Sequence, residues 1–158
     1  MIDFPKEVMD KFGLTHNPVR NGTGRRGGGG IDEPPIEFRK NGRLRRELLT
    51  ADAERWADRL YNSGKGVSST QLRKFFNEVK ALQSRIEAEG FEANDALVGM
   101  LKPKAAYALK RAEKKKKGGY ENLCNMIEQC VELCRSKDDF NDFALFFEAV
   151  MGFFKEGR

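Results

Sequence analysis

The feature that most constrains the fold of this chain is the spacing of its apolar residues, which recur every three or four positions from Leu44 onward. The clearest stretch begins with Ser68 and Gln71, which have the spacing of a capping box at a helix start. Apolar side chains then follow one face of residues 69–86, namely Leu72, Phe75, Phe76, Val79, Leu82 and Ile86. No segment of useful length alternates apolar and polar residues as a half-buried strand does. The sequence therefore predicts an all-α fold, a compact bundle of about five helices.

The other predicted helices combine the same spacing with start and stop signals. Thr50 has the side chain of a helix cap, and the glycine-containing segment 62–66 ends the helix that follows it. Pro103 breaks or kinks the third helix near Lys102, because proline disfavours helical geometry in the residue before it. We expect helices over residues 50–61, 68–86, 94–117 with this break, 120–135, and from 138 or 139 onward.

The N-terminal part of the chain has a different composition. Residues 13–42 are rich in glycine, hold three of the five prolines and contain few large apolar side chains. Such a segment cannot bury enough surface to offset the entropy lost on ordering. We therefore predict a flexible, partly disordered segment over residues 1–43 and a helical domain over residues 44–158. Within the first segment, residues 22–27 fit the pattern GxGxxG, but no apolar strand precedes them, so a dinucleotide site is not expected. Arg25 and Arg26 either contact nucleic acid loosely or belong to a solvated linker.

The residues that build common active sites and metal centres are missing from the predicted helical domain. The single histidine, His16, lies in the N-terminal segment, which excludes a histidine-based triad on the helices. The spacing of the three cysteines is not that of a zinc knuckle, so we interpret them as small buried hydrophobic residues. Three neighbouring aspartates either form a carboxylate cluster or, more simply, lie at a helix start, where capping and the helix dipole favour them. The cysteines are Cys124, Cys130 and Cys134, and the aspartates are Asp138, Asp139 and Asp142. We expect neither an enzyme nor a bound cofactor.

Secretion and membrane insertion are not expected either. An odd number of cysteines within one predicted helix argues against a disulfide framework. Residues 1–5 do not begin a signal peptide, and the longest apolar runs fall far below the roughly 20 residues that a membrane helix needs. We expect a cytoplasmic protein with no membrane partner.

The charge of the chain is positive and unevenly distributed. Lys and Arg number 29 against 24 Asp and Glu, which gives a net charge of +5. Residues 1–118 carry 25 of the basic and 16 of the acidic side chains, whereas residues 119–158 carry 4 and 8. This distribution favours a basic surface for an acidic ligand and an acidic surface for a protein neighbour.

Two polar and basic stripes follow the second and third predicted helices. Their members are Arg73, Asn77, Lys80 and Ser84 with Lys74 beside them, and Lys104, Tyr107, Arg111 and Lys114. Two cationic stripes, one of them with an aromatic ring, can form a groove that follows a phosphate backbone and stacks a base. A solvated surface is the alternative. The run of lysines at 114–117 surrounds the whole helix, so it is a solvated or loosely phosphate-binding loop or an import signal rather than a shaped site.

Three blocks of sequence resemble the small subunit of the type III-A CRISPR effector, the Csm complex. STQLRKFFNEV at residues 69–79 resembles a helix start of that family, and LKPKAAY at residues 101–107 with Arg111 is similar to its central segment. FEAVMGFFK at residues 147–155 resembles its C-terminal ending. Together the blocks, their order and their spacing cover residues 50–158.

The resemblance implies a helical ribonucleoprotein subunit of antiviral defence that has no catalytic activity. It implies several copies that stack on one another beside the backbone and large subunits of the complex. Those copies help to line the channel in which guide (CRISPR) RNA pairs with target RNA. Because base pairing then supplies the sequence specificity, such a subunit needs positive charge and shape rather than contacts to base edges.

Seven residues are predicted to contact RNA. Arg73, Lys74, Lys102 and Arg111 match motif positions of the family, and Asn77, Lys80 and Lys104 follow from the stripe spacing alone. Two alternatives stay open at this point. One is a helical protein–protein adaptor without nucleic-acid contact, and the other is the small subunit of the related type III-B effector.

Overall fold

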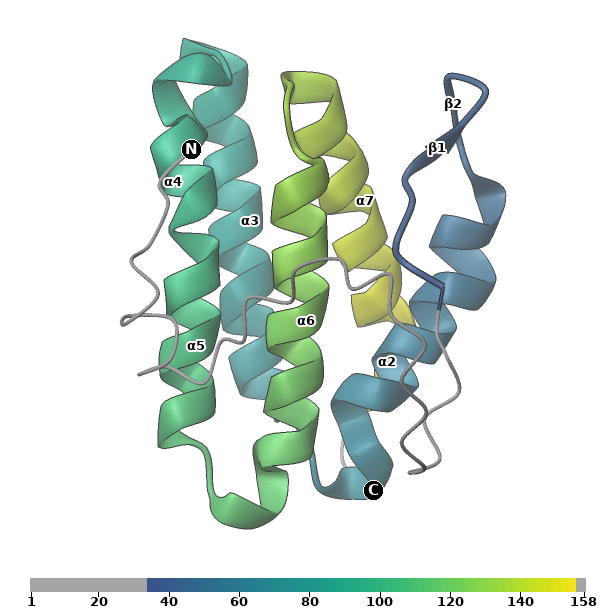
Figure 1. Ribbon diagram of the computed structural model, residues 1–158, viewed down its shortest axis with the longest axis vertical. Helices are drawn as coiled ribbons and strands as arrows, with labels where there is room; N and C mark the ends of the chain where they lie inside the picture. Colours follow the sequence, from purple (N-terminus) through teal and green to yellow (C-terminus); the bar gives the residue numbers. More distant parts are fainter. Residues whose placement is uncertain (1–33, 156–158) are drawn as a thin grey trace, which may run out of the picture.

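The computed structural model describes residues 34–155 and confirms the all-α prediction (Figure 1). The described sheet is a single antiparallel hairpin of β1 (Arg39–Lys40) and β2 (Arg43–Leu44). The α-helices are α2 (Ala53–Tyr61), α3 (Ser69–Glu89), α4 (Asp95–Gly99), α5 (Leu101–Arg111), α6 (Lys117–Leu133) and α7 (Lys137–Phe153). His16, Arg25, Arg26 and the GxGxxG pattern lie outside the described residues.

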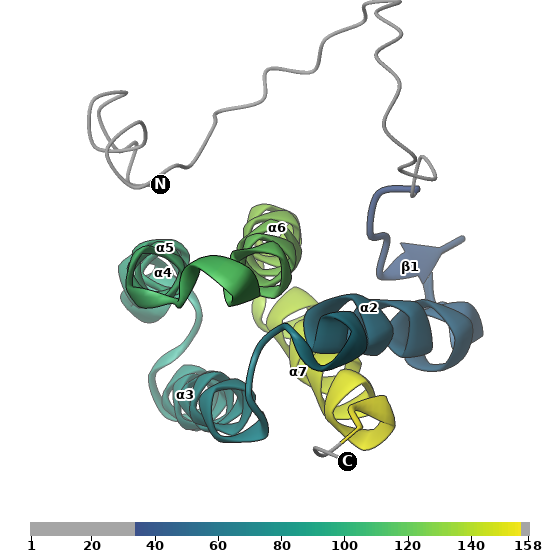
Figure 2. The ribbon, with the colours of Figure 1, turned by 90° about the horizontal axis from the view of Figure 1, so that it is seen from below.

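The helices follow one another around an open ring when the bundle is seen end-on (Figure 2). α5 packs against α6, α6 against α2, α2 against α7, and α7 against α3. Residues of α3 and α5 line a groove between the two helices. The two helices are joined at one end through α4 (Figure 1). This arrangement places a groove between the two helices that carry the predicted basic stripes.

Phenylalanines of α7 form much of the core of the bundle. Phe140, Phe143, Phe146 and Phe147 are fully buried, and Phe140 meets Phe143 edge-on with their ring centroids 5.6 Å apart. Each buried side chain of this size contributes about 1.5–3 kcal/mol relative to an exposed one. Trp56, at 3% exposed, belongs to the same core.

Hydroxyl side chains cap the starts of α3 and α7. Ser68 Oγ accepts a hydrogen bond from the Gln71 backbone N–H at 3.2 Å, which confirms the predicted start of α3. Ser136 does the same for the Asp139 N–H at 3.2 Å, so α7 begins at Lys137, one or two residues before the predicted start. Thr50, by contrast, does not cap a helix. It lies inside a π-helical turn, Leu48–Asp52, and its Oγ1 donates to the Arg46 carbonyl at 3.0 Å.

The third predicted helix is divided differently from expectation. The break falls at Met100, between α4 and α5, rather than near Lys102. Pro103 lies in the first turn of α5, where its missing N–H costs little. The helix also ends at Arg111 instead of continuing to Lys117, because the chain must reverse there for α6 to lie against α5. Ala112 is extended, and a short 3₁₀ turn over Lys114–Lys116 completes the reversal.

Gly118 and Gly119 were predicted to separate two helices, yet both lie inside α6. The reason is a close backbone approach. A Cβ atom on Gly119 would lie 2.4 Å from Gly66 Cα and 2.9 Å from the Leu60 carbonyl oxygen. Glycine at this position therefore lets α6 pack tightly against the loop that joins α2 to α3.

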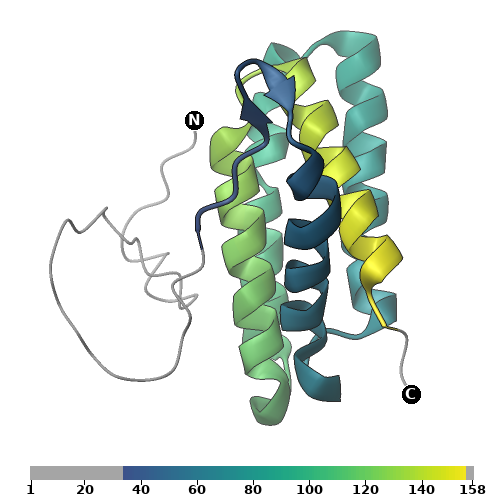
Figure 3. The same cartoon turned by 90° about the vertical axis from the view of Figure 1, so that its right-hand side faces the viewer.

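The folded part of the chain begins before residue 44, where the sequence placed the boundary. Ile36 and Phe38 are 6% and 5% exposed and belong to the core. The Ile36 N–H donates to Gln129 Oε1 on α6 at 2.8 Å. The hairpin follows this segment. In Figure 3 it lies above α2, with α6 on one side of that helix and α7 on the other. Two apolar side chains between prolines and arginines are too weak a periodic signal to indicate this packing from sequence.

Candidate functional site

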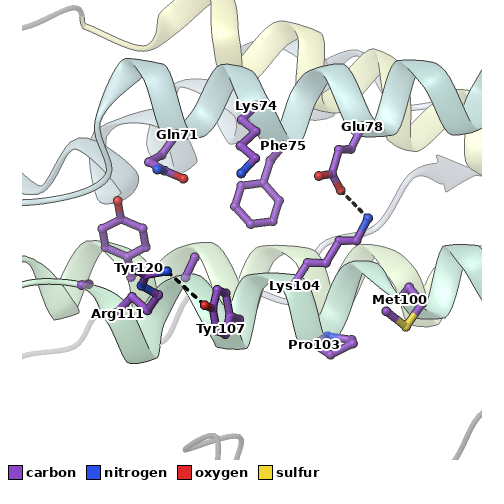
Figure 4. A pocket seen from close by; sticks show the side chains of 12 residues that line it. Gln71, Lys74, Phe75, Glu78, Met100, Pro103, Lys104, Tyr107, Arg111 and Tyr120 are labelled. Carbon is purple, nitrogen blue, oxygen red and sulfur yellow. Dashed lines mark hydrogen bonds and ion pairs between the residues drawn. The ribbon is translucent and has the colours of Figure 1, made fainter.

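The groove between α3 and α5 has a volume of about 790 Å³ (Figure 4). Its walls come from two helices and its floor partly from a third. The lining residues are Gln71, Lys74, Phe75 and Glu78 of α3, Met100 and Pro103 at the start of α5, Lys104, Tyr107, Ala108, Arg111 and Ala112 along it, and Tyr120 of α6. The groove thus combines an aromatic floor with cationic walls.

Helical periodicity explains why these side chains face the groove. On α3, Leu72 and Val79 are fully buried, which turns Gln71, Lys74 and Glu78 toward α5. On α5, the small residues Ala105 and Ala106 and the nearby Leu109 are buried. Lys104, Tyr107 and Arg111, at i, i+3 and i+7, line the groove. Lys104 reaches across toward α3, whereas Arg111 and Tyr107 lie together along α5 (Figure 4).

The floor is formed by Phe75 and Tyr120, which are 6% and 8% exposed. Burial raises the pKa of the Tyr120 hydroxyl, and hydrogen bonding with Ser68 partly opposes this shift. Tyr120 therefore stays a neutral phenol near pH 7. The floor offers ring surface without negative charge.

One ion pair crosses the groove. Lys104 Nζ lies 2.9 Å from Glu78 Oε2, with about half of the lysine side chain exposed (Figure 4). Lys74 has no hydrogen bond or ion pair with any residue from 34 to 155. Two of the groove's cations therefore differ in their partners, because Lys104 is paired with Glu78 whereas the ammonium group of Lys74 is available to a ligand.

Arg111 is held by its own helix. Its guanidinium donates to the Tyr107 hydroxyl at 3.0 Å and lies 5.6 Å from the centroid of that ring. Tyr107 is 54% exposed, which is unusual for an aromatic side chain. The pair presents a cation and a ring face together at one end of the groove.

The structure brings five of the seven predicted residues to this side of α3. Lys74, Lys104 and Arg111 line the groove, and Arg73 and Asn77 line an adjoining depression of about 590 Å³ that also includes Lys74. The other two point elsewhere. Lys80 Nζ donates to Gln83 Oε1 at 2.7 Å, and Lys102 Nζ lies 3.4 Å from Glu132 Oε1 on α6.

Gln71, Glu78 and Tyr120 are among the lining residues that were not identified as site residues from sequence. Gln71 was assigned to capping, and it caps through its backbone N–H while its side chain lines the groove. Glu78 shares the helical face of Lys74, four residues away, which is a signal that the sequence does contain. Tyr120 joins the floor only through the packing of α6, so no local pattern indicates it.

The buried cysteines and acidic residues do not form a second chemical centre in the described part of the chain. No group of three or more His, Cys, Asp or Glu within residues 34–155 could hold a metal ion. All three cysteines are buried, as predicted for small hydrophobes. Burial raises the pKa of the Cys124 thiol to about 12 and also raises the pKa values of Cys130 and Cys134. Asp142 is buried and paired with Arg39 of the hairpin rather than placed for capping.

Comparison with known proteins assigns the chain to a family. Residues 43–157 match the family described as Csm2 Type III-A, which covers most of the chain and all of the α-helices. No curated protein and no solved structure matches the chain significantly. Within residues 34–155, no helix is both long and apolar enough to cross a membrane. The family match agrees with the three sequence blocks and favours the type III-A small subunit over the type III-B alternative. The chain therefore belongs to the Csm2 Type III-A family, a family of structural small subunits of the Csm effector complex.

Proposed function

We propose that this chain is a non-catalytic RNA-binding subunit that works in the cytoplasm and contacts the RNA backbone through the groove between α3 and α5. In this proposal several copies stack on one another beside the backbone and large subunits. Together they line the channel in which guide RNA pairs with target RNA. Family membership supports the place in the complex, and the groove supports the contact.

The observation that carries the proposal is the convergence of Lys74, Lys104 and Arg111 on one groove from two different helices. Phosphate groups attract such cations whatever the base sequence, and this attraction supplies most of the affinity in non-specific binding. The exposed Tyr107 ring adds a surface on which a base can stack. A subunit that reads no sequence needs no further groups, because pairing between guide and target supplies specificity.

The remaining predicted residues are expected to contribute to the RNA contact to different degrees. Arg73 and Asn77 extend the contact along α3 beyond the groove. Lys80 and Lys102 stay proposed contacts, but each already interacts with a neighbouring side chain outside the groove. We therefore expect substitutions at Lys80 and Lys102 to weaken RNA binding less than substitutions at Lys74 and Arg111.

The test is the affinity of the full-length chain for a labelled oligouridine RNA, measured by fluorescence anisotropy over a range of salt concentrations. Lys74→Glu combined with Arg111→Glu should weaken binding and lower the slope of log Kd against log salt by about 1.4, or about 0.7 for each lost phosphate contact on a single strand. Lys65→Glu combined with Lys155→Glu is the matched control, because it changes the net charge equally at exposed positions away from the groove.

Two results separate the proposal from the adaptor alternative. Equal affinities and salt slopes for the groove variant and the control would show that the groove does not bind RNA. If the groove variant then also failed to assemble with the other Csm subunits, the groove would be a protein-docking surface and the adaptor function would replace the proposal.

A further inference from the structure

A second basic surface lies on the β-hairpin, away from the groove. Lys40, Arg43 and Arg46 are exposed, and none of them forms an ion pair within residues 34–155. Residues 34–46 contain five basic side chains and a single acidic one, Glu37. These unpaired cations form a further concentration of positive charge, apart from the groove and from the lysines at 114–117.

The other two arginines of this segment hold the hairpin on the bundle. Arg39 Nε lies 2.6 Å from Asp142 Oδ2 on α7, and the Asp142 carboxylate is almost fully buried. Arg45 donates to the Glu37 carbonyl at 2.8 Å and to Asp52 Oδ2 at 3.1 Å. The hairpin is thus held through β1 and through the residue that follows β2, so the backbone that carries its free cations is fixed on the bundle.

The turn of the hairpin places two cations directly opposite each other. Asn41 and Gly42 have φ values of 53° and 74°, the left-handed geometry of a tight two-residue turn. The register pairs Lys40 with Arg43, and directly opposite residues have Cβ atoms about 4.5–5.5 Å apart. Like charges at this spacing destabilise a hairpin. A local conflict of this kind, with no compensating carboxylate in the described chain, indicates a functional position.

The hairpin is separated from the groove in space and in sequence. α2, α6 and α7 lie between it and the open side of the ring formed by α3 and α5 (Figure 2). The family match begins at Arg43, so the first strand and the turn lie outside it. Arg43 and Arg46, the other two unpaired cations, lie inside the matched residues.

We propose that the hairpin is a second RNA-contact surface, in which Lys40, Arg43 and Arg46 bind successive phosphates of a strand that does not occupy the groove of the same subunit. A phosphodiester strand carries a negative charge on every nucleotide and can neutralise two neighbouring cations at once. Carboxylates on a protein surface are spread more irregularly, which favours RNA over an acidic protein partner. The proposal rests on the proposed function for the identity of the ligand, but not on the groove.

Lys40→Glu in the full-length chain gives the sharpest test, because RNA binding should weaken without a loss of stability. The substitution replaces the repulsive Lys40–Arg43 pair by an attractive one, so the urea unfolding midpoint should be unchanged or raised. Affinity for labelled oligouridine RNA should fall several-fold, and the salt slope should fall by at least about 0.7. Lys65→Glu is the matched control for the change in net charge.

Comparison with the groove double variant separates this inference from the proposed function. If Lys40→Glu binds RNA like its control while the groove variant loses affinity, the hairpin inference is overturned and the groove stands. If Lys40→Glu loses affinity and the groove variant does not, the hairpin contact is supported and the groove fails. If Lys40→Glu keeps RNA affinity but weakens association with another Csm subunit or a second copy, the partner is a protein and the inference is wrong.

Discussion

Replacing Gly119 by alanine should destabilise the fold, although the same change in most helices stabilises it. Alanine is favoured over glycine in a helix interior by about 1 kcal/mol. At this position, however, the new Cβ would lie 2.4 Å from Gly66 Cα and 3.0 Å from the Val67 nitrogen. Ordinary carbon–carbon contacts are about 3.5–4.0 Å, so α6 and the facing loop must separate by about 1 Å. Both sides of the contact are backbone, which cannot turn aside as a flexible side chain can.

The size of the effect follows from these two opposing terms. Inserting a methyl group into a well-packed contact costs about 1–3 kcal/mol, and a backbone-to-backbone contact belongs at the upper end of that range. After the gain in helix propensity, we expect a net loss of about 1–2 kcal/mol in the free energy of unfolding. The new Cβ would also crowd both ends of the 2.9 Å hydrogen bond from the Val67 N–H to the Leu60 carbonyl, 3.0 Å from the nitrogen and 2.9 Å from the oxygen.

Urea unfolding of the full-length chain, followed by circular dichroism, measures this change. Gly152→Ala is the matched control, since a Cβ there meets nothing within 4 Å and Gly152 also lies in a helix. It should gain about 0.4–1 kcal/mol. The two variants are thus expected to shift the midpoint in opposite directions at an unchanged slope. A Gly119→Ala protein as stable as the parent would refute the argument that close approach requires this glycine.

Two other predictions concern charge. Glu78→Gln removes the carboxylate that neutralises Lys104 across the groove, so the affinity for RNA at low salt should rise. The rise should be at most about fivefold, because an exposed ion pair contributes no more than ~1 kcal/mol. An unchanged or lower affinity, measured by fluorescence anisotropy, would show that Lys104 does not contact RNA. Because burial holds the pKa of Cys124 at about 12, above its ordinary value of 9.0, the folded state keeps a proton that the unfolded state loses. The free energy of unfolding should therefore be unaffected by this thiol below pH 9.0 and fall as the pH rises from 9.0 toward 12. Urea titrations across this range should show a shallower decline for Cys124→Ala than for the parent.

The sequence predicted those parts of the fold that depend on local pattern. The apolar face of α3 and its Ser68 start could be identified because periodicity and capping act within a few residues. The same holds for the phenylalanine-rich α7. The end of α5 at Arg111 could not, because lysines are good helix formers and the reversal is imposed by the packing of α6 on α5.

The candidate site was predictable to a similar degree. The stripe of α5 places Lys104 and Arg111 on one face, and periodicity alone shows this. Which face of α3 meets that stripe depends on the order of helices around the ring. For that reason Lys80 was grouped with Arg73 although it points toward Gln83. The hairpin arginines were missed because their partners, Asp52 and Asp142, belong to the helices and become neighbours only in the folded chain.

The open ring also explains why the groove does not close on itself. α4 joins α3 to α5 at one end and sets their separation there, while the rings of Phe75 and Tyr120 fill the floor between them. Tyr120 takes this position because Gly119, the residue before it, allows α6 to approach the Gly66 backbone so closely. The cations on either side are therefore held apart by packed aromatic rings and do not collapse onto the core. The helices that carry the cations are thus ordered before a ligand binds, so the entropy that the protein loses on binding falls mainly on the exposed side chains and not on the backbone.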